Sequence, residues 1–516
     1  YGSISYGSRN TQNYLFGYDE KFNDTTFNIS LNRQQTDGFA TLNPSQNYSN
    51  DGGNISNPTN NTFYSNNLSA NIVQIIRPGH EIGFKILASE LNSTIDATNN
   101  MNGITGNFSP AGPNGGSAYA YDYLEKQNSK NILSQIYLKD TINNYWNSNI
   151  TLGSSNTVTR TNWNSYDISE EPLSFFTTHQ NNLSWVNDFL LTQNQTILLG
   201  FQTQQTKVYS SSAYFSEDPF KAERNLNSVF SGYTGKFDAI GLQLNGRYDS
   251  TNKGQSATTG LGGISYDLTD RLKIASNISN AFILPTPYQL FSGAAMGGNT
   301  KLVPERDKSK EISLQYLDKN SLIRIVIFNR DTKNLIAAGT NYASGCSPDI
   351  YGYWKDGSSY CNTQLSNIAK SETNGIELSA KTIFNKTMLK ASLTFQNPLN
   401  KTYDTQLIRR AKDFGSLEVS YTIPKILLGG QLFITSSTPD IPVFESCNGQ
   451  ISCVKNPGYS IVNLFANYKF DNNWSAKLRV ENLFDRSYES AYGFNTPGFG
   501  AFLTLQYSPD TSRETQ

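Results

Sequence analysis

The sequence has few charges, few histidines and no long apolar run. Of its 516 residues only 16% are Asp, Glu, Lys or Arg, and 41 basic against 42 acidic residues give a formal net charge of -1. Without an excess of basic residues the chain lacks the electrostatic footprint that holds nucleic acid, so no nucleic-acid partner is expected. No stretch approaches the roughly 18 apolar residues that a membrane-spanning helix needs.

Uncharged polar and aromatic residues take the place of the missing charges. The chain has 30 Tyr, 29 Phe and 5 Trp, which argues for an ordered structure rather than a disordered polar chain. Asn, Ser, Thr, Tyr and Gly recur throughout, and these residues are poor helix formers. The composition therefore predicts an all-β protein, either soluble or a membrane β-barrel.

Apolar and polar residues alternate with a period of two. In the segment 474–481 every even position is apolar and every odd position is polar or charged, and the pattern recurs in 27–32, 81–86 and 242–247. Such strands have one apolar and one polar face. The apolar faces meet one another in a sandwich, whereas in a membrane barrel they meet lipid while the polar faces line a wet lumen.

The lengths of the links between strands favour the barrel, because outer-membrane barrels alternate short periplasmic turns with long outer loops. Ten short, turn-rich links and eleven longer ones predict about 22 antiparallel strands with both chain ends on the turn side. The short links are 23–24, 77–79, 143–144, 192–194, 236–238, 269–270, 318–320, 385–386, 423–425 and 471–473. The longer links are 7–10, 36–61, 92–128, 159–178, 211–223, 251–255, 282–306, 339–364, 398–410, 438–458 and 484–498.

Three segments in the second half of the chain resemble motifs of the TonB-dependent outer-membrane receptors. Residues 279–290, followed by 298–311 with Pro304, Glu305 and Glu311, are similar to the family's aPxxxqL…GNpxLxPExSxxxE segment. Residues 367–377 are similar to its N-x-x-x-A-x-x-x-G-v-E strand, with Gly375 and Glu377 in place and Ser371 instead of alanine. The signature of the penultimate strand is matched by Glu481, Asn482, Leu483, Phe484 and Asp485.

The resemblance implies a 22-stranded transmembrane barrel over residues 1–508 in the outer membrane of a Gram-negative cell, followed by a polar tail over 509–516. It implies an active transporter of a large, scarce nutrient and no enzyme. The family's N-terminal plug, which carries the TonB box, is absent from this chain; it would be a missing segment or a separate polypeptide. The expected partners are outer-membrane lipid and lipopolysaccharide, the plug, the TonB-type energy-coupling complex that acts through it, and a surface lipoprotein.

Within the family the chain is most similar to receptors for cobalamin, in residues 6–14, 407–412 and 488–498. A corrinoid is therefore the expected ligand, with a ferric siderophore as the alternative. Cobalamin receptors bind calcium through acidic residues of the second outer loop, but the corresponding stretch 36–61 contains only Asp37 and Asp51. Calcium needs several charged oxygens, so no metal site is expected in this loop. No cofactor is expected either. A passive channel and a barrel-anchored surface adhesin or scaffold remain alternatives from other classes.

The four cysteines fall as two pairs, each inside one predicted outer loop: Cys346 with Cys361, and Cys447 with Cys453. Disulfides that staple these loops are the preferred interpretation, because no histidine lies near either pair to complete a metal site.

Aromatic residues in the predicted outer loops are the candidates for ligand or partner contacts, since flat apolar rings suit a large ring-bearing ligand. The cluster of Tyr351, Tyr353 and Trp354 is the first choice, followed by Tyr288, Phe291 and Trp163. Rings close to strand ends are equally consistent with an aromatic girdle at the lipid interface. No pattern of residues indicates a catalytic site.

Overall fold

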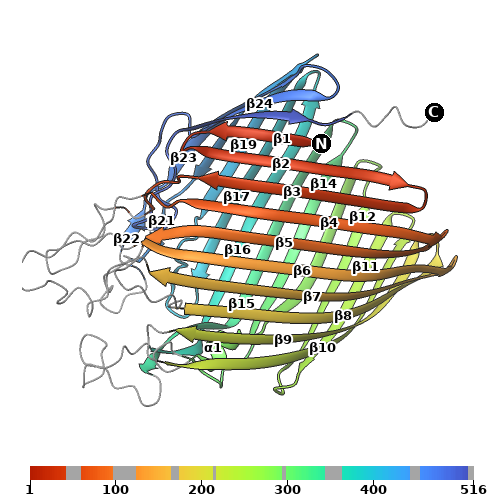
Figure 1. Ribbon diagram of the computed structural model, residues 1–516. Coiled ribbons are helices and arrows are strands. Elements are labelled where there is room, and N and C mark those ends of the chain that lie inside the picture. Colours follow the sequence, from red (N-terminus) through yellow and green to blue (C-terminus); the bar gives the residue numbers. More distant parts are fainter. Residues whose placement is uncertain are drawn as a thin grey trace, which may run out of the picture.

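The structure is a computed structural model that describes residues 1–41, 43, 60–96, 124–163, 174–212, 217–292, 298–342, 363–441, 452 and 454–509. These residues form one β-barrel (Figure 1). Its wall strands are β1 (Gly2–Gly7), β2 (Thr11–Phe22), β3 (Thr25–Thr36), β4 (Phe63–Arg77), β5 (His80–Asp96), β6 (Leu124–Asn143), β7 (Trp146–Trp163), β8 (Ser174–Thr192), β9 (Gln195–Ser212), β10 (Glu217–Phe237), β11 (Ile240–Thr251), β12 (Ser256–Asp267), β13 (Leu272–Ile283), β14 (Glu305–Leu317), β15 (Ser321–Tyr342), β16 (Thr363–Phe384), β17 (Thr387–Asn400), β19 (Asp413–Ile423), β20 (Ile426–Thr435), β23 (Tyr459–Lys469), β24 (Trp474–Glu481) and β25 (Gly500–Tyr507).

Each wall strand pairs antiparallel with the next, and the first strand pairs with the last. Along this closing seam β1 and β25 are in register from Gly2 opposite Tyr507 to Gly7 opposite Phe502. The two-residue strand β18 (Thr405–Gln406) pairs only with β17 and stands outside the wall. The predicted 22-stranded closed barrel is therefore confirmed.

The apolar residues of the wall face outward, not into a packed core. Ile136 on β6 is 48% exposed and Leu152 on β7 is 53% exposed, and their neighbours along each strand, such as Gln135 and Thr151, lie on the lumen side. Among the described residues only a few apolar side chains are buried: Val208, Ala257, Leu290, Leu302, Val326, Ala369 and Phe502. An apolar outer face around a polar lumen is the arrangement that lipid imposes on a barrel.

The ten short turns all lie where the sequence predicted them, at the right-hand end of the barrel in Figure 1. Asn23, Asp238 and Asn385 take positive φ angles in three of these turns, a conformation that Asn and Asp tolerate better than most residues. In another turn the carboxylate of Asp318 accepts the backbone N–H groups of Asn320 and Ser321. These bonds, the one from Asn320 foremost, lower the pKa of Asp318.

The opposite end carries the longer links, together with the helix α1 (Pro287–Phe291) and the hairpin of β21 (Thr438–Asp440) and β22 (Val454–Asn456). Several strands run farther into these links than predicted. The link expected over 92–128 is shorter, because β5 continues to Asp96 and β6 begins at Leu124. In this extension the backbone N–H and C=O groups of β5 and β6 hydrogen-bond to each other. This pairing maintains the strands without an alternation of apolar and polar side chains.

Candidate functional site: the outer mouth and the lumen wall

A short helix folds over the outer rim after β13. Thr286 caps α1: its side chain accepts the backbone N–H of Gln289, and the Gln289 side chain accepts the backbone N–H of Thr286. This capping box satisfies two N–H groups that a helix start leaves unpaired. Leu290 is buried, and the carbonyl of Pro285 accepts a 3.1 Å hydrogen bond from Arg224 of β10. The helix is therefore fixed to the barrel wall.

Two of the predicted contact residues, Tyr288 and Phe291, lie on α1. The ring of Tyr288 lies 6.0 Å from that of Phe220 on β10, and Lys253 lies over the ring of Phe291 at 6.0 Å. Both side chains are half-buried. They attach the helix to the rim, and their role towards a ligand stays a prediction.

Replacing Thr286 by alanine is expected to loosen this helix by about 1 kcal/mol, because the cap hydrogen bond is lost. Hydrogen exchange of the backbone amides in residues 286–292 should rise several-fold while exchange in the barrel strands stays unchanged. Thr286→Ser keeps the hydroxyl and is the control. Equal exchange in the alanine and serine variants would contradict the assigned cap.

A buried carboxylate joins three outer links on another side of the mouth. Asp440, at the end of β21, has 0% of its side chain exposed. One oxygen accepts Nε of Arg409 at 2.8 Å, and the other accepts Nδ2 of Asn456 at 2.9 Å and the backbone N–H of Tyr492 at 2.8 Å. Asp440 and Asn456 belong to the link after β20, Arg409 to the link after β17, and Tyr492 to the link after β24. The side chain of Asp440 therefore holds three links together. We call this group the Asp440 cluster.

The link after β24 also holds the start of the link after β3. Asn43 donates to the carboxylate of Glu489 at 2.6 Å, and Asn495 donates through its backbone N–H to the carbonyl of Thr41 at 2.7 Å. A second bond runs from the side chain of Asn495 to the carbonyl of Ala40 at 3.1 Å. Four links that are far apart in the sequence thus form one connected structure at the mouth.

The signature at the end of β24 has a structural explanation. Asn482 is 4% exposed and has a φ of 48°. Its side chain accepts the backbone N–H of Arg486 and donates to the carbonyl of the same residue, which closes a tight turn. Asp485, also at positive φ, accepts the backbone N–H of Phe499 at 2.7 Å and so directs the chain back into β25. Glu481 lies opposite Gly500 of β25, and Leu483 and Phe484 lie within the turn.

The other family-motif residues lie along β14 and β16. Pro304 is buried ahead of β14, Glu305 accepts the backbone N–H of Ile336 at 2.8 Å, and Glu311 accepts Nδ2 of Asn277 at 3.3 Å. Gly375 is required by close approach, since a Cβ there would lie 2.4 Å from the carbonyl oxygen of Phe395. Glu377 is an exposed residue two positions farther along β16.

The remaining predicted residues lie partly or wholly outside the described part of the chain. Trp163 is the last residue of β7, and only its backbone is described. Tyr351, Tyr353 and Trp354 lie outside the described residues, as do Cys346, Cys361, Cys447 and Cys453. Their predicted roles stay predictions.

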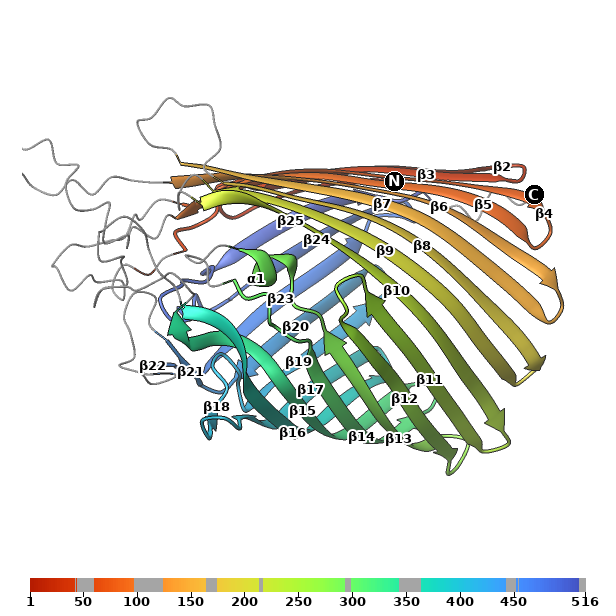
Figure 2. The ribbon, with the colours of Figure 1, turned by 90° about the horizontal axis from the view of Figure 1, so that it is seen from below.

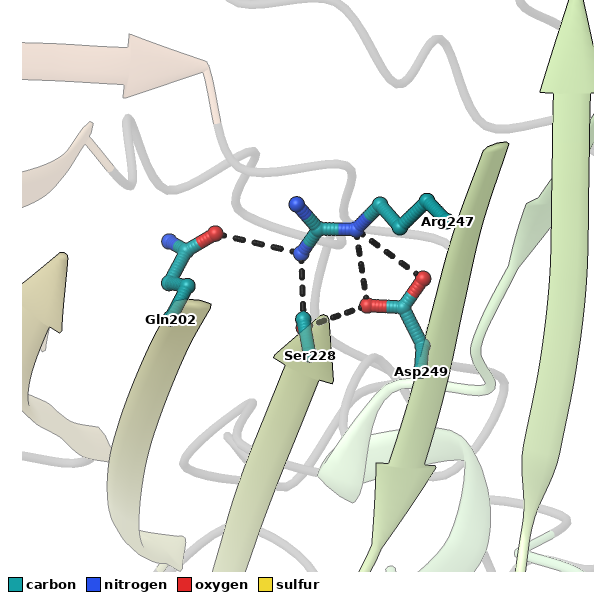
Figure 3. A network of polar contacts seen from close by, with 4 residues as sticks. All are labelled: Gln202, Ser228, Arg247 and Asp249. Atoms are coloured by element: carbon teal, nitrogen blue, oxygen red, sulfur yellow. Dashed lines mark hydrogen bonds and ion pairs between the residues drawn. The ribbon is translucent and has the colours of Figure 1, made fainter. Parts of the chain in front are cut away.

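A polar constellation on the lumen wall was not predicted from the sequence (Figure 3). Arg247 and Asp249 of β11 form an ion pair at 2.9 Å, and Ser228 of β10 donates to Asp249 at 2.5 Å. Nη2 of Arg247 donates to Oγ of Ser228 at 2.7 Å and to Oε1 of Gln202 of β9 at 3.1 Å. Nη1 has no hydrogen-bond partner among the described residues. Arg247 and Asp249 are two positions apart on one strand and therefore share a face. This spacing is the sequence feature from which their pairing could have been predicted.

The same constellation includes an aromatic ring held flat against the wall. Phe230, opposite both Gly200 and Arg247 in the ladder, has Arg247 over its ring at 5.3 Å. A Cβ at position 200 would lie 2.1 Å from this ring, so glycine is what lets the ring lie there. The wall thus presents a partly paired guanidinium on an aromatic support, which is suited to an anionic or hydrogen-bond-accepting group in the lumen.

No group of three or more His, Cys, Asp or Glu residues in the described ranges is placed to hold a metal ion. The described helical segment is also too short and too polar to cross a bilayer. The described residues form a polar lumen wall and a mouth built from connected links.

A closed 22-stranded wall of this kind is the architecture of large outer-membrane transport barrels, whose lumen is too wide for wall side chains to fill. The family model described as "TonB dependent receptor-like, beta-barrel" matches residues 87–483. The chain belongs to this family and is a β-barrel protein of the cell outer membrane.

Curated relatives include the vitamin B12 transporter BtuB of Photobacterium profundum, 26% identical over 330 residues that make up 63% of this chain and 49% of the relative. The BtuB protein of Vibrio vulnificus is 21% identical over 343 residues, 64% of this chain and 50% of the relative. The chain thus spans about half the length of the curated relatives it matches.

Solved structures of similar fold cover 98% of the chain. The ferric enterobactin receptor PfeA of Pseudomonas aeruginosa has a TM-score of 0.77 at 15% identity, with 80% of its own chain covered. The ferric-catecholate import receptor Fiu of E. coli has a TM-score of 0.71 at 12% identity, with 81% covered. At such low identity the likeness concerns the fold alone.

Proposed function

We propose that the chain is the barrel of an active importer that takes a large, scarce nutrient across the outer membrane. Its lumen is wider than its own side chains fill, so selective import requires a plug. The plug would fill the lumen, and the TonB-type energy-coupling complex would act on it. The free Nη1 of Arg247 is a suitable contact for a carboxylate or carbonyl of the plug or of a passing ligand. The barrel would supply the conduit and the outer recognition surface, without catalysis.

The ligand we propose is cobalamin or a related corrinoid. The observation that carries this choice is that two segments similar to cobalamin receptors, 407–412 and 488–498, meet at the Asp440 cluster through Arg409 and Tyr492. The curated relatives named as vitamin B12 transporters support it. The solved relatives named as siderophore receptors keep a ferric siderophore as the competing ligand.

Within this proposal Tyr351, Tyr353 and Trp354 contact the ligand or a surface lipoprotein. Tyr288, Phe291 and Trp163 are further proposed ligand contacts. The cysteine pairs Cys346 with Cys361 and Cys447 with Cys453 would brace the loops that carry these contacts. The barrel domain would extend over residues 1–508 and the polar tail over 509–516.

Uptake in living cells tests the transport proposal. Cells that lack their own corrinoid receptor and carry the full-length protein should accumulate radiolabelled cyanocobalamin. Accumulation should stop in cells without TonB or after an uncoupler is added, because active import depends on energy from the inner membrane. Deleting residues 351–354 should lower uptake at least about tenfold, in line with the loss of a cluster of large aromatic contacts.

A general channel would instead admit the label without energy and without saturation. Uptake of a ferric siderophore in place of cyanocobalamin would retain the importer and reject the corrinoid. Cells with the protein that take up neither compound faster than cells without it would overturn the importer proposal.

A further inference from the structure

A second arginine on the lumen wall rests on a phenylalanine ring, as in the constellation of Figure 3. Arg479 of β24 lies over the ring of Phe502 of β25 at 4.7 Å, and its Nε is 3.1 Å from the carboxylate of Glu481. A Cβ at Gly7 of β1 would lie 2.3 Å from the ring, so glycine is again what lets the ring lie there. The adjacent Leu503 is exposed on the outward face, so this group faces the lumen. We call it the Arg479 site.

The constellation of Figure 3, which we call the Arg247 site, is built from the same parts in the same order. In each site the arginine is on one wall strand, the ring is opposite it on the next strand, and the glycine is opposite the ring on the strand after that. The carboxylate follows two residues after the arginine, as Asp249 in one site and Glu481 in the other. A ring that covers a glycine stabilises a sheet by itself. The arginines therefore require a further explanation.

Both guanidinium groups keep N–H groups for another molecule. Arg247 uses Nε and Nη2 for its neighbours in the wall, and Nη1 has no hydrogen-bond partner among the described residues. Arg479 uses Nε for its carboxylate, and neither Nη1 nor Nη2 has a hydrogen-bond partner in the part of the chain that the structure describes. The side chain of Arg247 is 33% exposed and that of Arg479 is 59% exposed. A guanidinium that is stacked on a ring is pre-organised for a forked contact with a carboxylate or phosphate.

The two sites lie on opposite sides of the barrel. Their rings are on β10 and β25, the tenth and the last of the 22 wall strands, so about half of the wall separates them in either direction. In Figure 1 β10 is at the bottom and β1 and β24 are at the top, and Figure 2 looks from the β10 side towards β24 and β25. Arg247 comes seven residues after Ile240, where β11 leaves its turn, and Arg479 comes five residues after Trp474 of β24. Their depths in the lumen are therefore similar.

The charges around both sites favour an anion. At the Arg479 site Arg9 adds a second guanidinium, 5.7 Å from the centre of the Phe502 ring, so two cations face the single carboxylate of Glu481. Near the Arg247 site Arg224 lies on the same strand as the ring, closer to the mouth. Its Nε is buried without a hydrogen-bond partner in the described ranges. An excess of positive charge on a lumen wall attracts anionic groups.

We propose that the Arg247 and Arg479 sites bind anionic groups, carboxylate or phosphate, of the imported molecule while it crosses the lumen. The proposal rests on the importer function proposed above and adds to it two contacts below the outer recognition surface. Each arginine is already partly neutralised by its own carboxylate, so each contact is weak. Weak binding at more than one site is what passage through a conduit requires, because the molecule has to leave each site again.

Uptake and surface binding by cells that carry the full-length protein test the sites in the working transporter. The variant R247Q/R479Q should import radiolabelled cyanocobalamin about tenfold more slowly, because two charge-assisted contacts are lost. Binding of the label to energy-depleted cells should stay within about twofold, since the outer surface is unchanged. The control R324Q/R330Q removes two lumen-facing arginines of β15 for which no ring contact is found among the described residues, and its uptake should stay within about twofold.

A second variant separates the proposed contact from damage to the wall. R247K/R479K keeps both charges and the ion pair of the buried Asp249, but lysine lacks the forked donor. Its uptake should still be at least about threefold below that of the unmodified protein. Heat-modifiable gel migration checks that every variant is folded. Uptake at the unmodified rate in both R247Q/R479Q and R247K/R479K, or an equal loss in R324Q/R330Q, would overturn the proposal.

Two further measurements separate the sites from the plug and from the importer function. Arginines that hold the plug would make R247Q/R479Q cells sensitive to vancomycin, and this result would overturn the assignment to the imported molecule. Labelled inorganic pyrophosphate, in equilibrium dialysis against the 516-residue chain in detergent, should bind about tenfold more weakly to R247Q/R479Q and within about twofold to R324Q/R330Q. If the unmodified protein imports neither cyanocobalamin nor a ferric siderophore, the importer function fails. Equal pyrophosphate binding by all three proteins would then overturn the sites as well.

Discussion

Replacing Asp440 by alanine is expected to separate the outer links while the barrel stays closed. The carboxylate is fully buried, and its loss leaves Arg409, Asn456 and the N–H of Tyr492 without their acceptor. Removing one partner of a buried ion pair costs about 3–5 kcal/mol. The lower end is expected here because 42% of the Arg409 side chain remains exposed and is rehydrated. The effect is local, since the cluster contacts the links and not the ladder of the wall.

Hydrogen exchange in residues 405–412, 454–456 and 488–495 should therefore rise by about two orders of magnitude, in proportion to about 3 kcal/mol of lost local stability. The variants Arg409→Ala and Arg410→Ala form a matched pair, since both side chains are cationic neighbours and only Arg409 contacts Asp440. Arg409→Ala should resemble Asp440→Ala, and Arg410→Ala should resemble the unmodified protein. If cobalamin is the ligand, its affinity should fall in Asp440→Ala and Arg409→Ala but not in Arg410→Ala. Hydrogen exchange that rises equally in all three variants would exclude the cluster as the cause.

Placing arginine at position 503 is expected to destabilise the barrel by about 2–4 kcal/mol, the cost of a cation on the lipid face near the bilayer midplane. Leu503 is in the middle of the closing strand β25 and is 57% exposed on the outward face. The next residue, Thr504, faces the lumen, where its hydroxyl lies 2.7 Å from that of Ser5. Thr504→Arg should cost only about 1 kcal/mol for the lost hydrogen bond, because the cation stays in water.

Urea unfolding of the full-length protein refolded into phosphatidylcholine vesicles measures the difference. Trp474 of β24 reports on the packing of β25, since its ring lies 5.0 Å from that of Tyr507 on β25. The midpoint should fall strongly for Leu503→Arg and slightly for Thr504→Arg. A reversed order would mean that the two faces of β25 are assigned the wrong way round and that the outward surface is not the lipid-facing one.

The two faces of each strand and the positions of the turns were accessible from the sequence because both are local. Residues 474–481 alternate without exception, and a period of two leaves one possible face for lipid. Turns such as that at Asn23 are marked by residue types that tolerate positive φ. The links at the outer mouth were less accessible, because the strand pairing there continues beyond the lipid and no longer needs the alternating pattern.

The sequence by itself determined a closed barrel of 22 strands, its lipid-facing positions and its family, since these follow from short-range periodicity and from motifs of a few residues. Only the tertiary structure decided that Asp440 meets Arg409 and Tyr492, and that Arg247 lies over Phe230. The reason is physical: the partners of Asp440 lie 16 to 52 residues away along the chain. Such contacts depend on the closure and register of the whole wall, and no local pattern encodes them.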